Sequence, residues 1–112
     1  MTVNKTVLRR GDIILAPLGP AVGSEVDKTR PCLIVSPEEM NRHAPTVVIA
    51  PLTTKFKPYP WRVDCTIDGE DGQIMLDQIR TISKQRIVKW LGIMPEETSL
   101  RALDRLSEIF AP

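Results

Sequence analysis

The apolar residues of this chain fall into short runs that polar segments separate or prolines interrupt. Residues 31–36 carry an unbroken apolar stretch, residues 46–52 are rich in β-branched side chains, and residues 62–67 alternate between apolar and polar positions. Such runs are typical of short strands. A strand with a continuous apolar run is buried on both faces of its sheet, and a strand whose apolar and polar residues alternate is buried on one face. The pattern predicts six strands, over residues 13–18, 31–36, 46–52, 62–67, 73–82 and 87–93, with a hairpin turn at 68–72.

The sequence contains fewer signals for helices than for strands. Ser36 is placed as an N-cap with Pro37 at the first helical position, which predicts a helix of one or two turns before Pro45. A helical turn is expected at 84–86, and a longer helix opens at Pro95, with one apolar face formed by Leu100, Leu103, Leu106 and Phe110. Short, closely spaced strands and a terminal helix predict a mainly β fold with helices, in the form of a small, strongly bent barrel with a C-terminal α-helix.

Composition narrows the class of protein. A chain of 112 residues with 42% hydrophobic and 26% charged residues is typical of one globular domain, here residues 1–112, with 1–9 expected as a short polar arm. No apolar run reaches membrane-spanning length, and the N-terminus carries no export leader. We therefore expect a cytoplasmic protein without a membrane partner.

Neither the cysteines nor the histidine form a recognisable ligand cluster. Cys32 and Cys65 lie in apolar or alternating runs and make no CxxC pair, so both are expected to be reduced core residues. His43 is expected to be an exposed loop residue. The sequence therefore predicts no metal site and no cofactor.

The formal net charge of +1 does not by itself indicate a nucleic-acid-binding protein, but the charges are unevenly distributed. Between Glu39 and Asp64 there is no acidic residue, whereas four cations lie in that interval: Arg42, Lys55, Lys57 and Arg62. A locally basic face can bind phosphates even when the total charge is near neutral.

The order of strands predicts where these groups meet. If strands 31–36 and 46–52 pair antiparallel, the start of the first lies beside the end of the second. Arg30, which the following Pro31 holds in extended backbone, then lies next to Thr53 and Thr54. The loop that carries Glu25 is expected to hang over the same edge.

The segment 53–62 adds cations and rings to that edge. It contains Lys55, Lys57 and Arg62 together with Phe56, Tyr59 and Trp61, and such a combination is typical of surfaces that grip single-stranded nucleic acid. Each feature also has a structural explanation. Arg30 can pair with Glu25 or Asp27 at the surface, the two threonines can simply end a strand, and the aromatic residues can cap the core.

Three stretches carry a family resemblance: RGDIILAPLGPAVGSEVDKTRPCLIVSPEEMN, the APLTT that follows, and GQIMLDQIRTISKQRIVKWLG. In this order and spacing they resemble the MazF/PemK family of toxins from type II toxin–antitoxin pairs. The resemblance extends from Arg10 to the C-terminal helix. It implies an SH3-like β-barrel, a homodimer, a metal-independent endoribonuclease (mRNA interferase) acting on single-stranded RNA, and a cognate antitoxin that blocks the site.

The resemblance also implies roles for residues. Arg30 and Thr53 match the family's key arginine and threonine, with Thr54 beside them, and Glu25 matches a loop glutamate that is catalytic in some members. Asp77 and Gln78 match a pair near the substrate groove. Met75 and Ser24 stand where the PemK-like branch has an arginine and a histidine, so the chain is closer to the MazF-like branch.

The chemistry so implied is attack of the ribose 2′-hydroxyl on the adjacent phosphorus, leaving a 2′,3′-cyclic phosphate and a 5′-hydroxyl. Arg30 suits stabilisation of the developing charge, and Thr53 can add a donor. A guanidinium stays protonated in proteins, so Glu25 is the better base, provided that partial burial favours its protonated form. Two alternatives remain: a barrel of the same type that poisons DNA gyrase, and a non-catalytic RNA-binding module.

Overall fold

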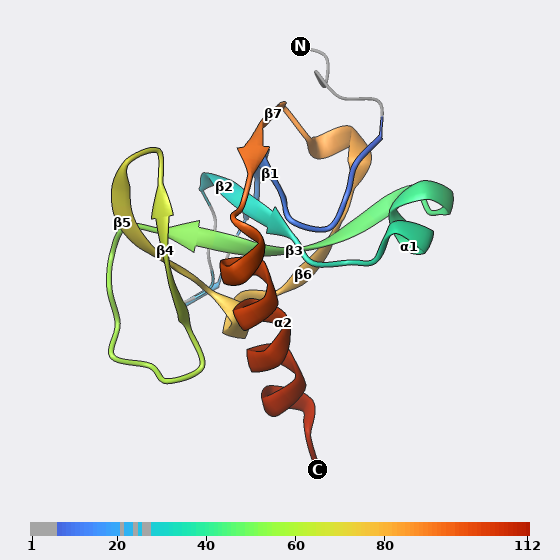
Figure 1. Ribbon diagram of the computed structural model, residues 1–112. Helices are drawn as coiled ribbons and strands as arrows, with labels where there is room; N and C mark the ends of the chain where they lie inside the picture. The colour runs from blue at the N-terminus through green and yellow to red at the C-terminus, as the bar shows by residue number, and fades with distance from the viewer. Residues whose placement is uncertain (1–6, 21, 24, 26–27) are drawn as a thin grey trace.

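The computed structural model describes residues 7–20, 22–23, 25 and 28–112. Its centre is one antiparallel sheet that curls around itself, with strand order β4-β5-β3-β2-β1-β7 and with β6 also paired to β3 (Figure 1). The strands are β1 (Asp12–Pro17), β2 (Thr29–Ile34), β3 (Thr46–Thr53), β4 (Val63–Ile67), β5 (Glu70–Ile74), β6 (Arg80–Ser83) and β7 (Lys89–Ile93). The predicted mainly β fold, an open SH3-like barrel with a C-terminal helix, is confirmed.

The strand β3 organises the sheet because it pairs along both of its edges. On one edge it runs antiparallel to β2, with Cys32 opposite Pro51 and Ile34 opposite Ile49. On the other edge its first half pairs with β6 and its last two residues pair with β5. The antiparallel pairing of the second and third predicted strands is therefore confirmed.

The predicted strand 73–82 is wrong in one respect, because a 3₁₀ helix, η1 (Leu76–Gln78), divides it into β5 and β6. Pro51 explains the break. The Pro51 carbonyl accepts a hydrogen bond from Met75 N at 2.8 Å, but a proline has no N–H to donate on the same edge. The ladder is interrupted there, and the three residues of η1 are looped out between the two strands.

The strand β2 begins two residues earlier than predicted, so Arg30 lies inside the strand and not at its junction with the loop. Pro31 pairs with Leu15 of β1, whereas the pairing with β3 starts only at Cys32. Since Pro31 faces one neighbouring strand only, its missing N–H removes no ladder hydrogen bond to β3.

The hairpin between β4 and β5 is tighter than predicted. Only Asp68 and Gly69 form the turn, both with positive φ (51° and 83°), and Ile67 pairs with Glu70 across it. An Asp-Gly turn of this kind suits the twist of two antiparallel strands. Residues 70–72 therefore belong to β5 and bring Gly72 alongside β3.

The short helix α1 (Glu38–His43) connects β2 to β3, but Ser36 does not cap it. Pro37 occupies the N-cap position instead. The Ser36 hydroxyl donates to Asn41 Oδ1 at 2.5 Å and accepts from Val48 N at 3.0 Å. The serine therefore joins the helix to β3, a tertiary contact that local sequence does not reveal.

The expected helical turn at residues 84–86 is confirmed as the 3₁₀ helix η2 (Lys84–Arg86).

The helix α2 (Glu96–Phe110) crosses one face of the sheet (Figure 1). Ala102 is fully buried, and Leu106 packs against the core cluster that Leu33, Val35 and Ala50 share. The sheet covers only part of the expected apolar face, because Leu100 and Phe110 are 53% and 70% exposed. A second cluster, which contains Ile14, Cys32 and Ile34, fills the other face, so the sheet is buried on both sides.

The N-terminal arm is shorter than expected. Leu8 is buried in the core, and Arg9 N donates to Asp12 Oδ2 at 2.8 Å, so residues 7–9 belong to the folded unit. Residues 1–6 of the expected arm lie outside the described residues. Within the part of the chain described here, no helix has the length and apolar character needed to cross a membrane.

Candidate active site

A pocket of about 170 Å³ lies where the start of β2 meets the end of β3. We call it the Arg30 pocket. It brings together one arginine and three threonines from two distant parts of the sequence. The residues that line it are Lys28, Thr29, Arg30, Pro31, Leu52, Thr53, Thr54 and Ile67. The prediction that Arg30 meets Thr53 and Thr54 at one edge is confirmed.

Thr53 is held with a defined orientation. Its side chain is buried, with 6% exposed, and Oγ1 accepts a hydrogen bond from Lys55 N at 3.1 Å. Its backbone pairs with Gln73 of β5. Because the hydroxyl oxygen already accepts the amide hydrogen, its own hydrogen is left to donate. Thr53 can thus offer one hydrogen bond to an anion in the pocket.

The side chain of Arg30 carries a hydrogen-bond donor that the described residues leave unpaired. Its Nε is buried and has no hydrogen-bond partner among the residues that the structure describes. A buried donor without a partner is costly to the fold. The cation also reaches the neighbouring thiol: burial raises the pKa of Cys32 to about 12, while the charges of Arg30 and Arg80 act in the opposite direction.

Glu25 lies in a neighbouring pocket of about 440 Å³, which we call the Glu25 pocket. The carboxylate is exposed, and Oε1 accepts a hydrogen bond from Val22 N at 2.8 Å within its own loop. This pocket is lined by Pro20, Glu25, Pro51, Asp77, Gln78, Ile79 and Arg80. The burial required for Glu25 to act as a poised base is therefore not found, and Glu25 does not line the Arg30 pocket.

A third and larger hollow, of about 660 Å³, separates the segment 54–62 from α2. We call it the helix groove. Four cations line it (Lys57, Arg62, Arg101 and Arg105), together with Pro58, Tyr59, Pro60, Val63, Asp64 and Gln73. Its size alone does not make it the reaction site, because two of its arginines, Arg62 and Arg105, are bonded to protein groups.

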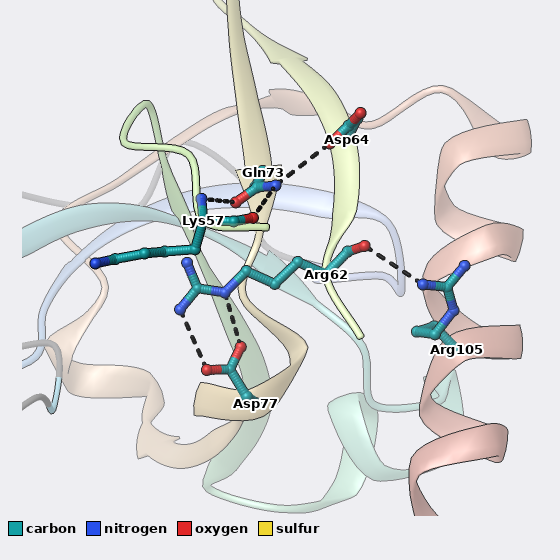
Figure 2. Close-up of polar contacts among 6 residues, drawn as sticks. All are labelled: Lys57, Arg62, Asp64, Gln73, Asp77 and Arg105. Carbon is teal, nitrogen blue, oxygen red and sulfur yellow. Dashed lines mark hydrogen bonds and ion pairs between the residues drawn. The ribbon is translucent and has the colours of Figure 1, made fainter. Parts of the chain in front are cut away.

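The side chain of Arg62 is only 8% exposed and forms a two-point ion pair with Asp77. Nε lies 3.0 Å from Oδ1, and Nη2 lies 3.2 Å from Oδ2 (Figure 2). On the helix, Arg105 donates to the Arg62 carbonyl at 3.5 Å and pairs with Glu108 at 3.2 Å. Sequence reasoning treated Arg62 and Asp77 as separate contacts to substrate, whereas the structure joins them to each other.

Most of the remaining predicted residues line one of these hollows. Thr54, Lys55 and Lys57 are exposed, as expected for residues that meet a ligand in solution. Gln78 is half-buried and lines the Glu25 pocket. Phe56, Tyr59 and Trp61 expose 52%, 37% and 39% of their surfaces, so these rings do not cap the core.

Sequence reasoning missed a glycine behind the site. A Cβ built on Gly72 would lie 2.7 Å from the carbonyl oxygen of Thr53 and 2.5 Å from Ile67 Cδ1. Glycine is therefore required for β5 to approach the end of β3 as closely as it does. The signal in the sequence was weak, since Gly72 looked like part of the hairpin turn.

Three arginines were also missed. Arg80 donates through Nη1 to the Leu18 carbonyl at 2.7 Å and lines the Glu25 pocket. Arg101 and Arg105 line the helix groove from α2. Their spacing of four residues on a predicted helix was the available signal, because it places both on one helix face.

The cysteines are not placed to act as nucleophiles or as metal ligands at this surface. Both cysteines are free, and burial together with the charge of Asp64 raises the pKa of the Cys65 thiol to about 11. Across the described residues, His, Cys, Asp and Glu side chains do not gather in threes where they could hold a metal ion.

Known proteins resemble this chain along most of its length. A family model described as PemK-like, MazF-like toxin of type II toxin–antitoxin system matches residues 9–110. The chain is 34% identical over 97 residues to Endoribonuclease EndoA of Bacillus subtilis (strain 168), covering 81% of this chain and 84% of that protein.

Solved structures show the same fold. MazF (Form-I) from Deinococcus radiodurans has a TM-score of 0.82 at 23% identity, covering 94% of this chain and 97% of that one. A mycobacterial endoribonuclease in complex with its cognate antitoxin has a TM-score of 0.76 at 26% identity, covering 96% and 98%. The matches span almost the whole fold and include the strands that form the Arg30 pocket, and the chain belongs to the family of PemK-like, MazF-like toxins of type II toxin–antitoxin systems.

Proposed function

We propose that this chain is a metal-independent endoribonuclease that cuts single-stranded RNA, with mRNA as its expected target in the cytoplasm. One observation carries the proposal: Arg30 and Thr53 line a single pocket, and the buried Arg30 Nε has no protein partner among the described residues. An arginine and a threonine that line one small pocket are residue types that suit the phosphorane formed when a phosphodiester is attacked. The endoribonuclease named among the relatives supports this reading.

The proposed reaction forms a bond between the ribose 2′-oxygen and phosphorus and breaks the bond from phosphorus to the 5′-oxygen. The 2′-hydroxyl loses its proton, and the departing 5′-oxygen takes one from water. The products are a 2′,3′-cyclic phosphate and a 5′-hydroxyl. Arg30 and Thr53 stabilise the negative charge on the non-bridging oxygens, where preorganised donors lower the barrier most.

Glu25 remains our candidate for the general base. Because it lies in the neighbouring pocket, it acts through one bound water and not by direct contact with the 2′-hydroxyl. Pro51 of β3 lines the Glu25 pocket, and the next residues of the same strand, Leu52 and Thr53, line the Arg30 pocket. Such an arrangement is consistent with a slow enzyme.

The substrate strand is proposed to lie across the surface that joins these pockets. Lys55 and Lys57 supply mobile positive charge for phosphates, and Thr54 and Gln78 supply hydrogen bonds. The exposed rings of Tyr59 and Trp61 are available for stacking against bases.

We propose a homodimer that joins through β7 and α2. Leu91 and Ile93 on the edge strand β7 are 41% and 67% exposed, and Leu100 and Phe110 on α2 are 53% and 70% exposed. Exposed apolar side chains of this size on adjoining elements are typical of subunit interfaces. Trp90, on the same strand, is partly buried and packs against the core. Light scattering of Ile93→Glu and Phe110→Glu should show dissociation to monomers.

The second proposed partner is a cognate antitoxin that covers the cationic surface. A mycobacterial relative was solved with its own antitoxin, which supports the assignment. Because Lys55, Lys57 and the arginines of the helix groove are basic, the antitoxin segment is expected to be acidic. Binding should therefore weaken as the salt concentration rises.

The test is incubation of purified protein with a long RNA in EDTA. We expect discrete fragments with 5′-hydroxyl ends and cyclic phosphates. An Arg30→Ala variant should leave the RNA intact, while Arg42→Ala, a matched arginine on the exposed side of α1, should cut normally. Intact RNA that is merely retained by the wild-type protein, or inhibition of DNA supercoiling without cleavage, would contradict the proposal.

A further inference from the structure

We propose that Gln73 and Asp77 are positioning residues that hold the segment 54–62 in one conformation, so that Tyr59 and Trp61 meet the RNA as a preformed pair of rings. The inference rests on the proposed function for its substrate and on the geometry for its mechanism. It assigns Asp77 and Arg62 a role within the protein and not a direct contact with RNA.

The first attachment point is the side-chain amide of Gln73. Its Oε1 accepts from Lys57 N at 3.0 Å, and its Nε2 donates to the Lys57 carbonyl at 3.0 Å (Figure 2). The amide thus pairs with both backbone groups of one residue, as a neighbouring strand would. Gln73 is only 6% exposed, and its own backbone pairs with Thr53. It therefore ties the segment to the strand that carries the candidate catalytic threonine.

The second attachment point is the ion pair between Arg62 and Asp77. Two parallel N–H donors meet two carboxylate oxygens, a geometry that fixes direction as well as distance. The Arg62 side chain is 8% exposed and that of Asp77 is 24% exposed, so water reaches the pair from the side of the carboxylate. Asp77 belongs to η1, so the end of the segment is fixed to the element that Pro51 loops out of the sheet.

The chain between the two points is short and stiff. It contains Pro58 and Pro60, whose φ angles are fixed by their rings, and Arg62 N donates to the Tyr59 carbonyl at 3.1 Å. The rings of Tyr59 and Trp61 stack with centroids 4.8 Å apart and planes inclined by 17°. The Arg62 guanidinium carbon lies 5.0 Å from the centroid of the Tyr59 ring.

This arrangement places exposed aromatic surface on a segment that is anchored at both ends. A platform that is ordered before binding loses less entropy when a base stacks on it. Base choice then depends on the fixed position of the rings, so loosening either attachment point should widen the set of sequences that are cut. A direct role of Asp77 in binding RNA is disfavoured, because its two oxygens already accept from Arg62.

The test compares Gln73→Ala, Asp77→Asn and the charge-exchanged double variant Arg62→Asp/Asp77→Arg with wild type. Gln85→Ala and Asp104→Asn are the matched controls, since both residues are exposed and lie outside the three hollows. Hydrogen exchange of the Lys57 amide, followed by NMR, reports on the segment without RNA. Cleavage of a randomised RNA pool, with kcat and KM for one preferred site, reports on substrate recognition.

In Gln73→Ala we expect the Lys57 amide to exchange about tenfold faster, as for the loss of one or two hydrogen bonds. We also expect KM to rise by about tenfold with kcat changed less, and the set of cut sequences to widen. Asp77→Asn should act in the same direction, and the charge exchange should restore most of the selectivity. Both control variants should match wild type.

The inference is overturned if the Lys57 amide is unaffected by Gln73→Ala, or if the charge-exchanged variant is as impaired as Asp77→Asn. The second result would mean that Asp77 contacts RNA itself. If the wild-type protein cuts no RNA, the proposed function fails instead, and the role in RNA recognition fails with it. The exchange measurement still decides whether Gln73 holds the segment.

Discussion

Two arginines, Arg30 and Arg62, were both expected to meet RNA, and the structure treats them in opposite ways. Arg62 is almost fully buried and bonded at two points to Asp77. Arg30 lines a small pocket, and its buried Nε finds no partner among the described residues. The Arg62 guanidinium is bonded within the protein, whereas we propose that the Arg30 guanidinium binds the substrate.

The difference shows that positive charge alone is a poor guide to a site. An arginine whose donors are satisfied by a carboxylate contributes to the position of a segment, and opening that pair to bind a phosphate costs its hydrogen bonds. An arginine with an unsatisfied buried donor gains hydrogen bonds when an anion arrives.

Replacing Arg30 should have the largest effect. Arg30→Ala removes the principal cationic donor of the pocket, and loss of one such donor typically lowers kcat by about 10²- to 10³-fold. Arg30→Lys should recover only part of the rate, since an ammonium cannot present two parallel donors. Arg62→Ala should lower kcat by less than about tenfold while raising KM. Equal loss of kcat in Arg30→Ala and Arg62→Ala would remove the distinction between them.

Replacing Thr53 should have the second-largest effect on kcat. Thr53→Val keeps the size of the side chain but removes the hydroxyl, so the pocket loses a donor and Lys55 N loses its acceptor. We expect kcat to fall by about 10²-fold and thermal stability to fall slightly. Thr53→Ser keeps the hydroxyl and should retain most of the activity. A fully active Thr53→Val enzyme would argue against the hydroxyl as a donor in the reaction.

Gly72 should have a smaller, indirect effect. In Gly72→Ala the added methyl meets the Thr53 carbonyl, a backbone atom that cannot move aside on its own. We expect destabilisation by about 1–3 kcal/mol and a roughly tenfold loss of kcat, because the end of β3 shifts within the pocket. Adding Ile67→Ala relieves only the side-chain clash and should leave kcat low. Denaturant unfolding and single-turnover cleavage measure the two effects.

The thiols should matter least. Burial raises the pKa of Cys32 from 9.0 to about 12 and that of Cys65 from 9.0 to about 11, so both stay protonated and slow to alkylate at pH 8. A raised folded-state pKa gives stability that is present below pH 9 and is lost as the pH rises towards 11 and 12. Iodoacetamide labelling against pH is the measurement. Rapid labelling of Cys32 in the folded protein at pH 8 would contradict its burial beside Arg30.

Much of the site follows from patterns in the sequence. The apolar runs at 31–36 and 46–52 were enough to predict two neighbouring antiparallel strands, and that pairing alone brings Arg30 to Thr53. The β-branched content of one run and the short connection between them limited the arrangements available. The resemblance to the toxin family then indicated which of the gathered residues carry the chemistry.

What could not be predicted depends on contacts between distant residues. Pro51 divides the strand opposite it into β5 and β6, and the effect appears 24 or more positions later in the chain. The ion pair between Arg62 and Asp77 joins the segment 54–62 to η1, the element that interrupts the strand. The sequence around either residue does not indicate that the other is its partner. Ser36 looks like a helix cap from its neighbours, but β3 supplies a better partner for its hydroxyl.

The most direct test is the crystal structure of the protein with a short RNA whose nucleotide at the cleavage site lacks the 2′-hydroxyl, so that it binds without being cut. We expect the phosphate that follows this nucleotide to lie in the Arg30 pocket, with its oxygens within hydrogen-bond distance of the Arg30 guanidinium and Thr53 Oγ1. We also expect Arg62 to keep its two bonds to Asp77. A phosphate seated in the helix groove on Arg62, with the Arg30 pocket empty, would contradict this expectation.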